Sequence, residues 1–174
     1  MPAVAACALP EGSLLLGYAI DGGFVDGYAT SVAGCVPLAA FVEAFYSTPL
    51  FRIERALLGA LARRPSTDAE AGALGRGERE CFAAWSVEAR AQDQLLLRDF
   101  TGRTRSWLMV APAAAGTRLL FGSAVVAARS GDGAPRLRFP FTALLGFHRL
   151  YSRLLLAAAA RRVESLSAPA IPAD

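Results

Sequence analysis

The chain has 174 residues, a mass of 18.3 kDa and a formal net charge of +3. This length is typical of one domain and is sufficient to bury a core without disulfides or a metal. With 54% hydrophobic and 19% charged residues, the composition excludes a disordered chain. No uncharged run reaches the roughly 20 residues of a membrane span.

All 18 basic side chains are arginines, and the chain contains neither lysine nor asparagine. Together with abundant alanine, glycine and proline, this bias indicates a GC-rich coding sequence, so the arginine content is weak evidence of nucleic-acid binding. The arginines are spread along the chain and form no basic arm or nucleic-acid-binding motif. We therefore expect no nucleic-acid partner.

Cysteine and histidine usage argues against a metal centre. Cys7, Cys35 and Cys81 lie far apart without a CxxC motif, and His148 is the only histidine. The motifs GxGxxG, GxxxxGK[ST] and HExxH are absent, so we expect neither a cofactor nor a metal. The N-terminus lacks the positively charged start of a signal peptide, and reduced thiols fit a cytoplasmic protein.

The predicted elements begin after an irregular lead-in at residues 1–23, which proline and glycine interrupt. A short strand is expected over 28–34. Two helices follow, at about 37–47 and 49–62, because apolar residues recur every three or four positions. Pro49 separates the two helices, since a proline disfavours helix at the residue before it and suits the first turn of the next.

Residues 65–79 are rich in glycine, alanine and charge, and they predict a surface loop with at most one short helical turn. The pattern then alternates, which predicts an antiparallel meander of serial hairpins. Its strands are expected at 81–91, 94–100, 103–111 and 118–128. A long helix is expected from about 140 to 164, so residues 24–164 form one α+β domain before a flexible tail at 165–174.

Tight turns at 92–93 and 101–102 predict the strand register and therefore the two sheet faces. One face should collect large, mostly apolar side chains, and the final helix is long enough to cover it. The residues expected on this face are Trp85, Val87, Leu96, Arg98, Phe100, Arg105, Trp107, Met109, Leu119, Phe121 and Ser123.

Arg98 and Arg105 stand directly opposite each other in this register, where two like charges repel. One interpretation is that they hold the anionic end of a ligand at the rim of an apolar pocket. The other is that their stems cover apolar surface, or that Asp99, Glu43 or Glu54 neutralises them.

The final helix carries His148, Tyr151 and Ser152 on its inward stripe. They predict polar groups in a cavity, with His148 as a weak candidate acid or base. The alternative is a hydrogen-bonded core histidine. A Ser–His–acid triad with Ser123 or Ser152 has no support from a GxSxG motif.

The order of strand, two helices, meander and long C-terminal helix resembles the helix-grip fold of the START, Bet v 1 and polyketide-cyclase-like (SRPBCC) superfamily. An uncharacterised bacterial family near this superfamily is similar in several segments. These are Tyr28-Ala29 at the start of the first strand, FYSTPL at 45–50, FRIERALLGAL at 51–61, WSVEAR at 85–90 and FHRLYSRLL at 147–155. The resemblance implies a cavity between the sheet and the last helix and supplies no catalytic residues. The expected meander has four strands where six are usual.

The sequence thus predicts a protein that binds a small hydrophobic or amphipathic molecule between the sheet and the C-terminal helix. The expected ligand-binding residues are Trp85, Arg98, Phe100, Arg105, Trp107, Phe121, Ser123, His148, Tyr151 and Ser152.

Two other functions remain open at this point. One is a cyclase/aromatase- or hydrolase-like enzyme that uses His148 as acid or base and Arg98 or Arg105 to stabilise an oxyanion. The other is a protein or membrane-surface interaction module built on the C-terminal helix. The oligomeric state is also open, with a dimer among the alternatives.

Overall fold

The computed structural model describes residues 3–20, 23–62, 65–126, 128–129, 135–136 and 141–167. Its main element is a seven-stranded antiparallel sheet in the order β1-β2-β7-β6-β5-β4-β3. The strands are β1 (Ala5–Ala6), β2 (Phe24–Ala33), β3 (Cys81–Phe82), β4 (Trp85–Arg90), β5 (Gln94–Asp99), β6 (Thr104–Ala113) and β7 (Gly116–Val125). A second sheet pairs β8 (Ala128–Arg129) with β9 (Pro135–Arg136).

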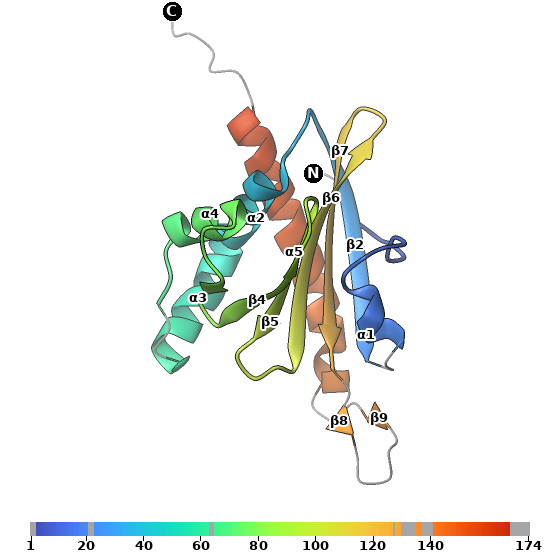
Figure 1. Cartoon of the computed structure of the whole chain (residues 1–174), viewed down its shortest axis with the longest axis vertical. Helices are drawn as coiled ribbons and strands as arrows, with labels where there is room; N and C mark the ends of the chain where they lie inside the picture. Colours follow the sequence, from blue (N-terminus) through green and yellow to red (C-terminus); the bar gives the residue numbers. More distant parts are fainter. Residues whose placement is uncertain are drawn as a thin grey trace, which may run out of the picture.

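Five helices accompany the sheet in the described residues (Figure 1). They are α1 (Leu16–Ile20), α2 (Leu38–Tyr46), α3 (Pro49–Ala62), α4 (Asp68–Arg76) and α5 (Phe141–Ser167). The long α5 and the shorter α2 pack across one side of the sheet, which we call the helix face. The N-terminal segment with α1 packs on the other side, the outer face. This is the expected α+β, helix-grip-like architecture.

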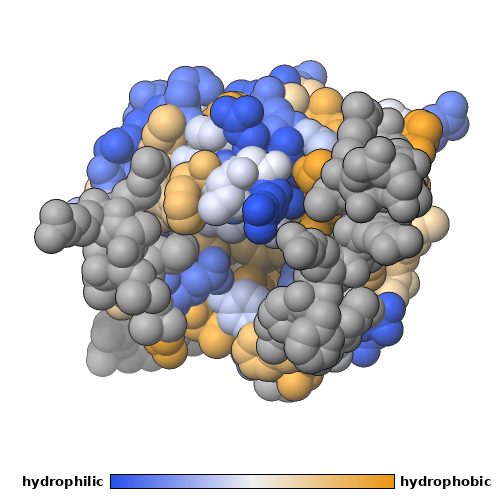
Figure 2. Space-filling model, turned by 90° about the horizontal axis from the view of Figure 1, so that it is seen from below, coloured by the Kyte–Doolittle hydropathy of each residue, from blue (hydrophilic) through white to orange (hydrophobic). Residues whose placement is uncertain are grey.

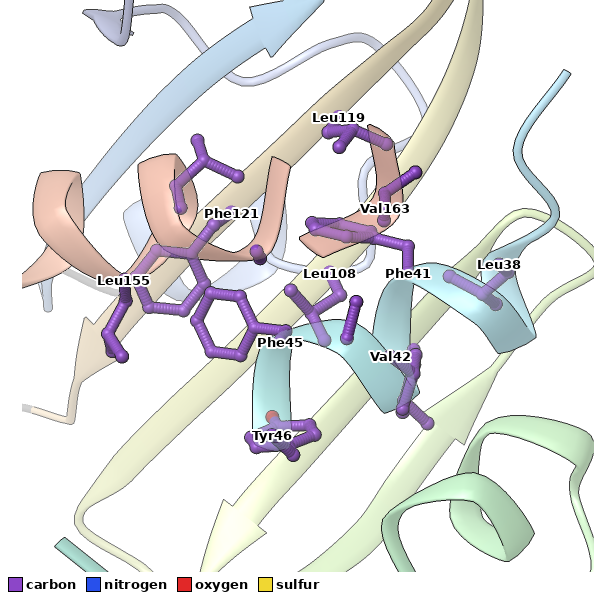
Figure 3. Packing of buried hydrophobic residues seen from close by; sticks show 14 of the residues in the cluster. Leu38, Phe41, Val42, Phe45, Tyr46, Leu108, Leu119, Phe121, Leu155 and Val163 are labelled. Carbon is purple, nitrogen blue, oxygen red and sulfur yellow. The ribbon is translucent and has the colours of Figure 1, made fainter. Parts of the chain in front are cut away.

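The helix face is filled with aromatic and aliphatic side chains over most of its length. Phe41 and Phe45 of α2 and Leu155 of α5 lie against Leu108 and Phe121 of the sheet (Figure 3). The ring centroids of Phe45 and Phe121 are 4.7 Å apart. This part of the interface is therefore a packed core.

The outer face has its own core around Trp107, which is fully buried. Leu15 from the N-terminal segment is also fully buried there. Gln94 ties the segment down, since its side chain accepts hydrogen bonds from the Leu14 N–H at 3.0 Å and Trp107 Nε1 at 2.9 Å and donates to the Gly12 carbonyl at 3.2 Å. Part of the expected irregular lead-in is thus an ordered cover.

The prediction that α5 covers the face with Trp107 and Arg105 is wrong. The turn between β6 and β7 pairs Ala113 with Gly116, which sets Trp107 opposite Gly122. Phe121 therefore falls on the helix face, and Trp107 falls on the outer face. The expected single face is divided between the two sides of the sheet.

The first hairpin also departs from the predicted register. A bulge between Val87 and Ala89 sets Trp85 opposite Asp99 instead of residue 100. An extra residue in one strand reverses the alternation beyond it, so Trp85 and Val87 pack against the helix-face core. The pairs predicted between the next two strands, β5 and β6, are confirmed: Leu96 lies opposite Trp107, and Arg98 lies opposite Arg105.

The surface loop expected at 65–79 contains the regular helix α4. Thr67 and Glu70 form a capping box at its start, and Gly77 ends it with a positive φ of 79°. Ala71 and Leu74 are fully buried in the helix-face core. The Thr-x-x-Glu spacing and the final glycine were visible in the sequence and should have predicted this helix.

The prediction of one strand at 81–91 is wrong, since the chain turns at Ala83, which has a positive φ of 50°, and β3 pairs antiparallel with β4. Elsewhere the element boundaries differ by a few residues. The first long strand begins at Phe24 instead of residue 28, and residues 165–167 of the expected tail continue α5. The rest of that tail, 168–174, lies outside the described residues. Within the described part of the chain, no helix is both long and apolar enough to span a membrane.

We predict that Leu15→Ala destabilises the protein by about 2–5 kcal/mol, because it leaves a cavity in the outer core. Ile20→Ala is the matched control, since Ile20 is 79% exposed, and it should change the unfolding free energy by less than about 0.5 kcal/mol. Urea unfolding measures both variants. Equal effects of the two substitutions would show that the N-terminal segment contributes no core.

Candidate functional site

The helix face becomes polar toward the end of the sheet where β2 begins and β7 ends. Asp26, Ser123 and Ser106 are register partners in β2, β7 and β6, so they form one row across three strands. We call these three residues the polar row. The row two residues further into the sheet holds Tyr28 and Phe121 and belongs to the aromatic core.

Asp26, Ser123 and His148 form a hydrogen-bonded cluster between this row and α5. Ser123 Oγ donates to Asp26 Oδ1 at 2.6 Å, and His148 Nε2 lies 2.8 Å from Ser123 Oγ and 3.3 Å from Asp26 Oδ2. The Tyr28 hydroxyl donates to Asp26 Oδ2 at 3.1 Å. The side chain of Asp26 is 11% exposed and that of His148 is 29% exposed. The histidine is therefore held on one side and accessible on the other.

The charge state of Asp26 follows from its partners. Burial alone disfavours the carboxylate, but hydrogen bonds from His148, Ser123 and Tyr28 outweigh it and hold the pKa of Asp26 below its ordinary 3.8. Burial and the neighbouring Asp26 carboxylate raise the pKa of Tyr28 to about 12. At neutral pH the cluster thus contains an ionised carboxylate and a protonated tyrosine.

This geometry is not that of a nucleophilic serine. A serine hydroxyl has one proton, and Ser123 donates it to Asp26. His148 must then donate to Ser123, so its Nε2 carries a proton and does not act as a base toward that hydroxyl. The arrangement favours a positioned histidine over an activated serine.

Two further hydrogen-bonded pairs of polar side chains lie on the helix face near the same end of the sheet. Tyr46 of α2 hydrogen-bonds Ser106 at 2.9 Å between hydroxyl oxygens. Tyr151 of α5 donates to the Glu54 carboxylate of α3. Burial raises the pKa of Glu54, although the hydrogen bond from Tyr151 acts in the opposite direction. Burial and Glu54 together raise the pKa of Tyr151.

Two buried donors near these groups have no hydrogen-bond partner among the described residues. They are Trp85 Nε1 and Ser152 Oγ. Trp85 packs against the helix-face core at the same end of the sheet, because its register partner Asp99 lies next to the β5–β6 turn. Figure 2 views the molecule from this end, where hydrophilic and hydrophobic side chains lie next to each other. Unpaired buried donors are costly, which indicates that this end accepts a further hydrogen-bonding group.

The structure brings six of the ten sequence-predicted site residues to the helix face. They are Trp85, Phe121, Ser123, His148, Tyr151 and Ser152. The other four do not join them. Trp107 lies in the outer core, Arg98 is exposed opposite Arg105, and Phe100 is exposed beside the β5–β6 turn.

Arg105 is bound within the outer face and is not available to an anionic ligand. Its Nε lies 2.7 Å from Glu88 Oε2 and donates to the Tyr18 hydroxyl at 2.8 Å, and its guanidinium stacks over the Tyr18 ring. Glu88 therefore neutralises Arg105, instead of the Asp99, Glu43 or Glu54 considered from the sequence. The bulge beside Glu88 is the local feature that the sequence did not reveal.

The sequence interpretation missed Asp26 as a site residue because the first strand was expected to begin at residue 28. It named Glu54 only as a counter-charge for the arginines, and it missed Tyr46 and Ser106. Phe24, Val25 and Tyr28 favour a strand, but Asp26-Gly27 between them is typical of a turn, so the signal for Asp26 in the sequence was weak.

A separate hollow of about 670 Å³ lies at the opposite end of the sheet. Its walls are mostly loop and strand-end residues, including Cys35, Val36 and Pro112. The hydroxyl of Thr117 is already used there, since it donates to the Gly34 carbonyl at 2.7 Å and accepts from the Val36 N–H at 2.9 Å. This hollow offers few polar groups to orient a ligand, so the polar row is the stronger candidate site.

Among the described residues, no group of three or more histidine, cysteine, aspartate or glutamate side chains could hold a metal ion. The chain matches no protein-family model and no curated protein sequence.

We predict that Asp26→Asn lowers the unfolding free energy at pH 6 by about 1–3 kcal/mol, because it removes the carboxylate that His148 and Ser123 contact. The folded-state pKa of Asp26 is depressed, so its contribution is complete above the ordinary pKa of 3.8 and is lost as the pH falls through the folded-state value. The difference between the two proteins should therefore shrink toward pH 3.

Urea unfolding of both proteins across this range tests the prediction. Asp68 and Asp99 also have depressed pKa values, but they are common to both proteins and cancel in the difference. A difference that stays constant with pH would contradict the assigned role of the Asp26 charge.

Proposed function

We propose that the chain binds a small amphipathic molecule with an uncharged polar end, at the polar row beneath the N-terminal half of α5. The observation that carries this proposal is the partly exposed His148, held by buried Asp26 and Ser123 where the aromatic core stops. The resemblance to the helix-grip superfamily supports it, because that fold implies a cavity between the sheet and the last helix.

The polar row is difficult to explain by stability alone. An ionised carboxylate beneath helices is costly unless it is paired, and apolar residues of similar size would serve packing at least as well. The indole N–H of Trp85 remains unpaired among the described residues. Trp85 stands in β4, three strands from Ser123 in β7, so its N–H would take a second acceptor of the ligand, apart from the polar end held at His148.

The charges of the site favour an uncharged polar end. Two carboxyl groups, Asp26 and Glu54, face this end of the sheet, against the one imidazole of His148. An anionic ligand would meet the Asp26 carboxylate, and Arg105 is on the outer face with its charge used by Glu88. A neutral alcohol, ketone or amide end has no such conflict.

The aromatic core limits where the apolar part of the ligand can lie. Tyr28, Phe45 and Phe121 fill the interface further along the helix face, so a ligand cannot extend far beneath α2. Val87 and Leu97 lie in the same cross-strand row as Ser106 and offer apolar contact. Burial of ligand surface against them contributes about 25 cal/mol per Å².

The two tryptophans provide an internal test, because Trp85 lies on the helix face and Trp107 on the outer face. Titration with 1-decanol should change the tryptophan fluorescence of the wild type and of Trp107→Phe, and this response should disappear in Trp85→Phe. Decanoate, which has the same chain and a charged end, should bind more weakly. Native mass spectrometry of the freshly purified protein should identify a co-purifying molecule.

Two results would contradict ligand binding at this site. One is a decanol response that is kept in Trp85→Phe and lost in Trp107→Phe, which would place the binding on the outer face. The other is the absence of both a response to decanol and a co-purifying molecule.

Acid–base catalysis at His148 is a second candidate function, favoured by the 3.3 Å contact between its Nε2 and Asp26. Here Asp26 would position the imidazole, and His148 would transfer a proton to the bound molecule. The co-purifying molecule provides the test. The molecule that co-purifies with His148→Gln should be chemically altered on incubation with the wild type and unchanged on the variant.

We also propose that the protein acts in a bacterial cytoplasm. Cys7, Cys35 and Cys81 are free thiols in the structure, and Cys35 and Cys81 are exposed. Exposed free thiols fit a reducing compartment.

A further inference from the structure

Exposed hydrophobic side chains gather at the same end of the molecule as the polar row. Five large ones, between 37% and 79% exposed, come from four separate parts of the chain. We call them the apolar rim: Ile20 at the end of α1, Phe100 at the β5–β6 turn, Val126 after β7, and Phe147 and Leu150 in α5.

Backbone and ring contacts show that these parts of the chain meet. The Val126 N–H donates to the Arg103 carbonyl in the β5–β6 turn at 2.8 Å. The Gly23 N–H donates to the Tyr18 carbonyl of α1 at 3.2 Å. The Phe24 ring meets the His148 ring of α5 edge-on, with centroids 6.3 Å apart. Figure 2 shows hydrophobic residues spread around this end among hydrophilic ones.

Arginines are exposed at this end among the described residues. Arg98, Arg103 and Arg149 are exposed beside the apolar rim. Of the described acids nearby, Asp99 accepts the Arg103 and Thr104 N–H groups, Glu88 pairs with Arg105, and Asp26 is bound in the histidine cluster. The sequence of α5 from 141 to 163 carries four arginines and no acidic residue.

We propose that the apolar rim docks on the interface of an anionic lipid membrane. Apolar side chains interspersed with arginines match such a surface, because the rings enter the headgroup region while the guanidinium groups meet lipid phosphates. The proposal rests on exposure and charge alone and does not depend on ligand binding at the polar row.

A membrane fits these residues better than a second copy of the chain. An interface between two α5 helices would bring arginines together without acidic partners from residues 141–163, which is unfavourable. Phe147, Leu150 and Leu154 form an exposed stripe on α5, but Ile20, Phe100 and Val126 lie outside this helix, so an interface between two α5 helices would leave these three exposed. A fluid lipid surface can take up apolar side chains that come from separate parts of the fold.

The test is co-sedimentation of the full chain with phosphatidylcholine vesicles, with and without phosphatidylglycerol. We expect binding to the anionic vesicles that weakens as salt is raised. The double variant Phe147→Gln/Leu150→Gln should bind about tenfold more weakly or worse, because two exposed apolar contacts are lost. Arg103→Gln/Arg149→Gln should lose the preference for phosphatidylglycerol.

Leu166→Gln is the matched control, because Leu166 is 68% exposed near the other end of α5. It should bind vesicles like the wild type, and thermal unfolding checks that each variant remains folded. The proposal is overturned if the wild type binds no vesicles or if Leu166→Gln weakens binding as much as the double variant. It is also overturned if Phe147→Gln/Leu150→Gln dissociates a dimer in light scattering while vesicle binding is unchanged.

Discussion

The pairing of β6 with β7 is the constraint on which the rest of the structure depends. The turn that joins them is tight, and Gly116 crosses β2 so closely that a Cβ there would lie 2.1 Å from the Val32 carbonyl oxygen. With Ala113 fixed opposite Gly116, alternation sends Phe121 and Ser123 to the helix face and Trp107 to the outer face. The positions of both cores and of the polar row follow from this one register.

The helix face contains both a packed apolar core and a hydrogen-bonded polar row. Around Phe45 and Phe121 it is a packed core that stabilises α2 and α5 on the sheet. One cross-strand row away it holds Asp26 and Ser123, whose hydrogen bonds position His148. The change from packing to polar chemistry occurs where the N-terminal half of α5 crosses the sheet, so a single helix contributes to both.

The sequence predicted the architecture better than the site. Helical periodicity and Pro49 located α2 and α3, and alternation located the meander, because these signals are local. The side chains beneath α5 depended on a two-residue turn and on a bulge near Glu88, and neither has a local sequence signature. Arg105 was therefore assigned to the wrong face, while Ser123, His148 and Tyr151 were named but Asp26 was not.

The Gln94 hydrogen bonds hold the N-terminal segment on the outer face of the sheet. Through Gly12, Leu14 and Trp107 they attach a short N-terminal segment over an apolar sheet surface that the rest of the fold leaves open. A chain shortened past Leu15 would keep its helix-face core and still expose Trp107, Leu96 and Leu120 to water. Two such surfaces would stack on each other, so proteolytic loss of this segment would lead to aggregation before it led to unfolding.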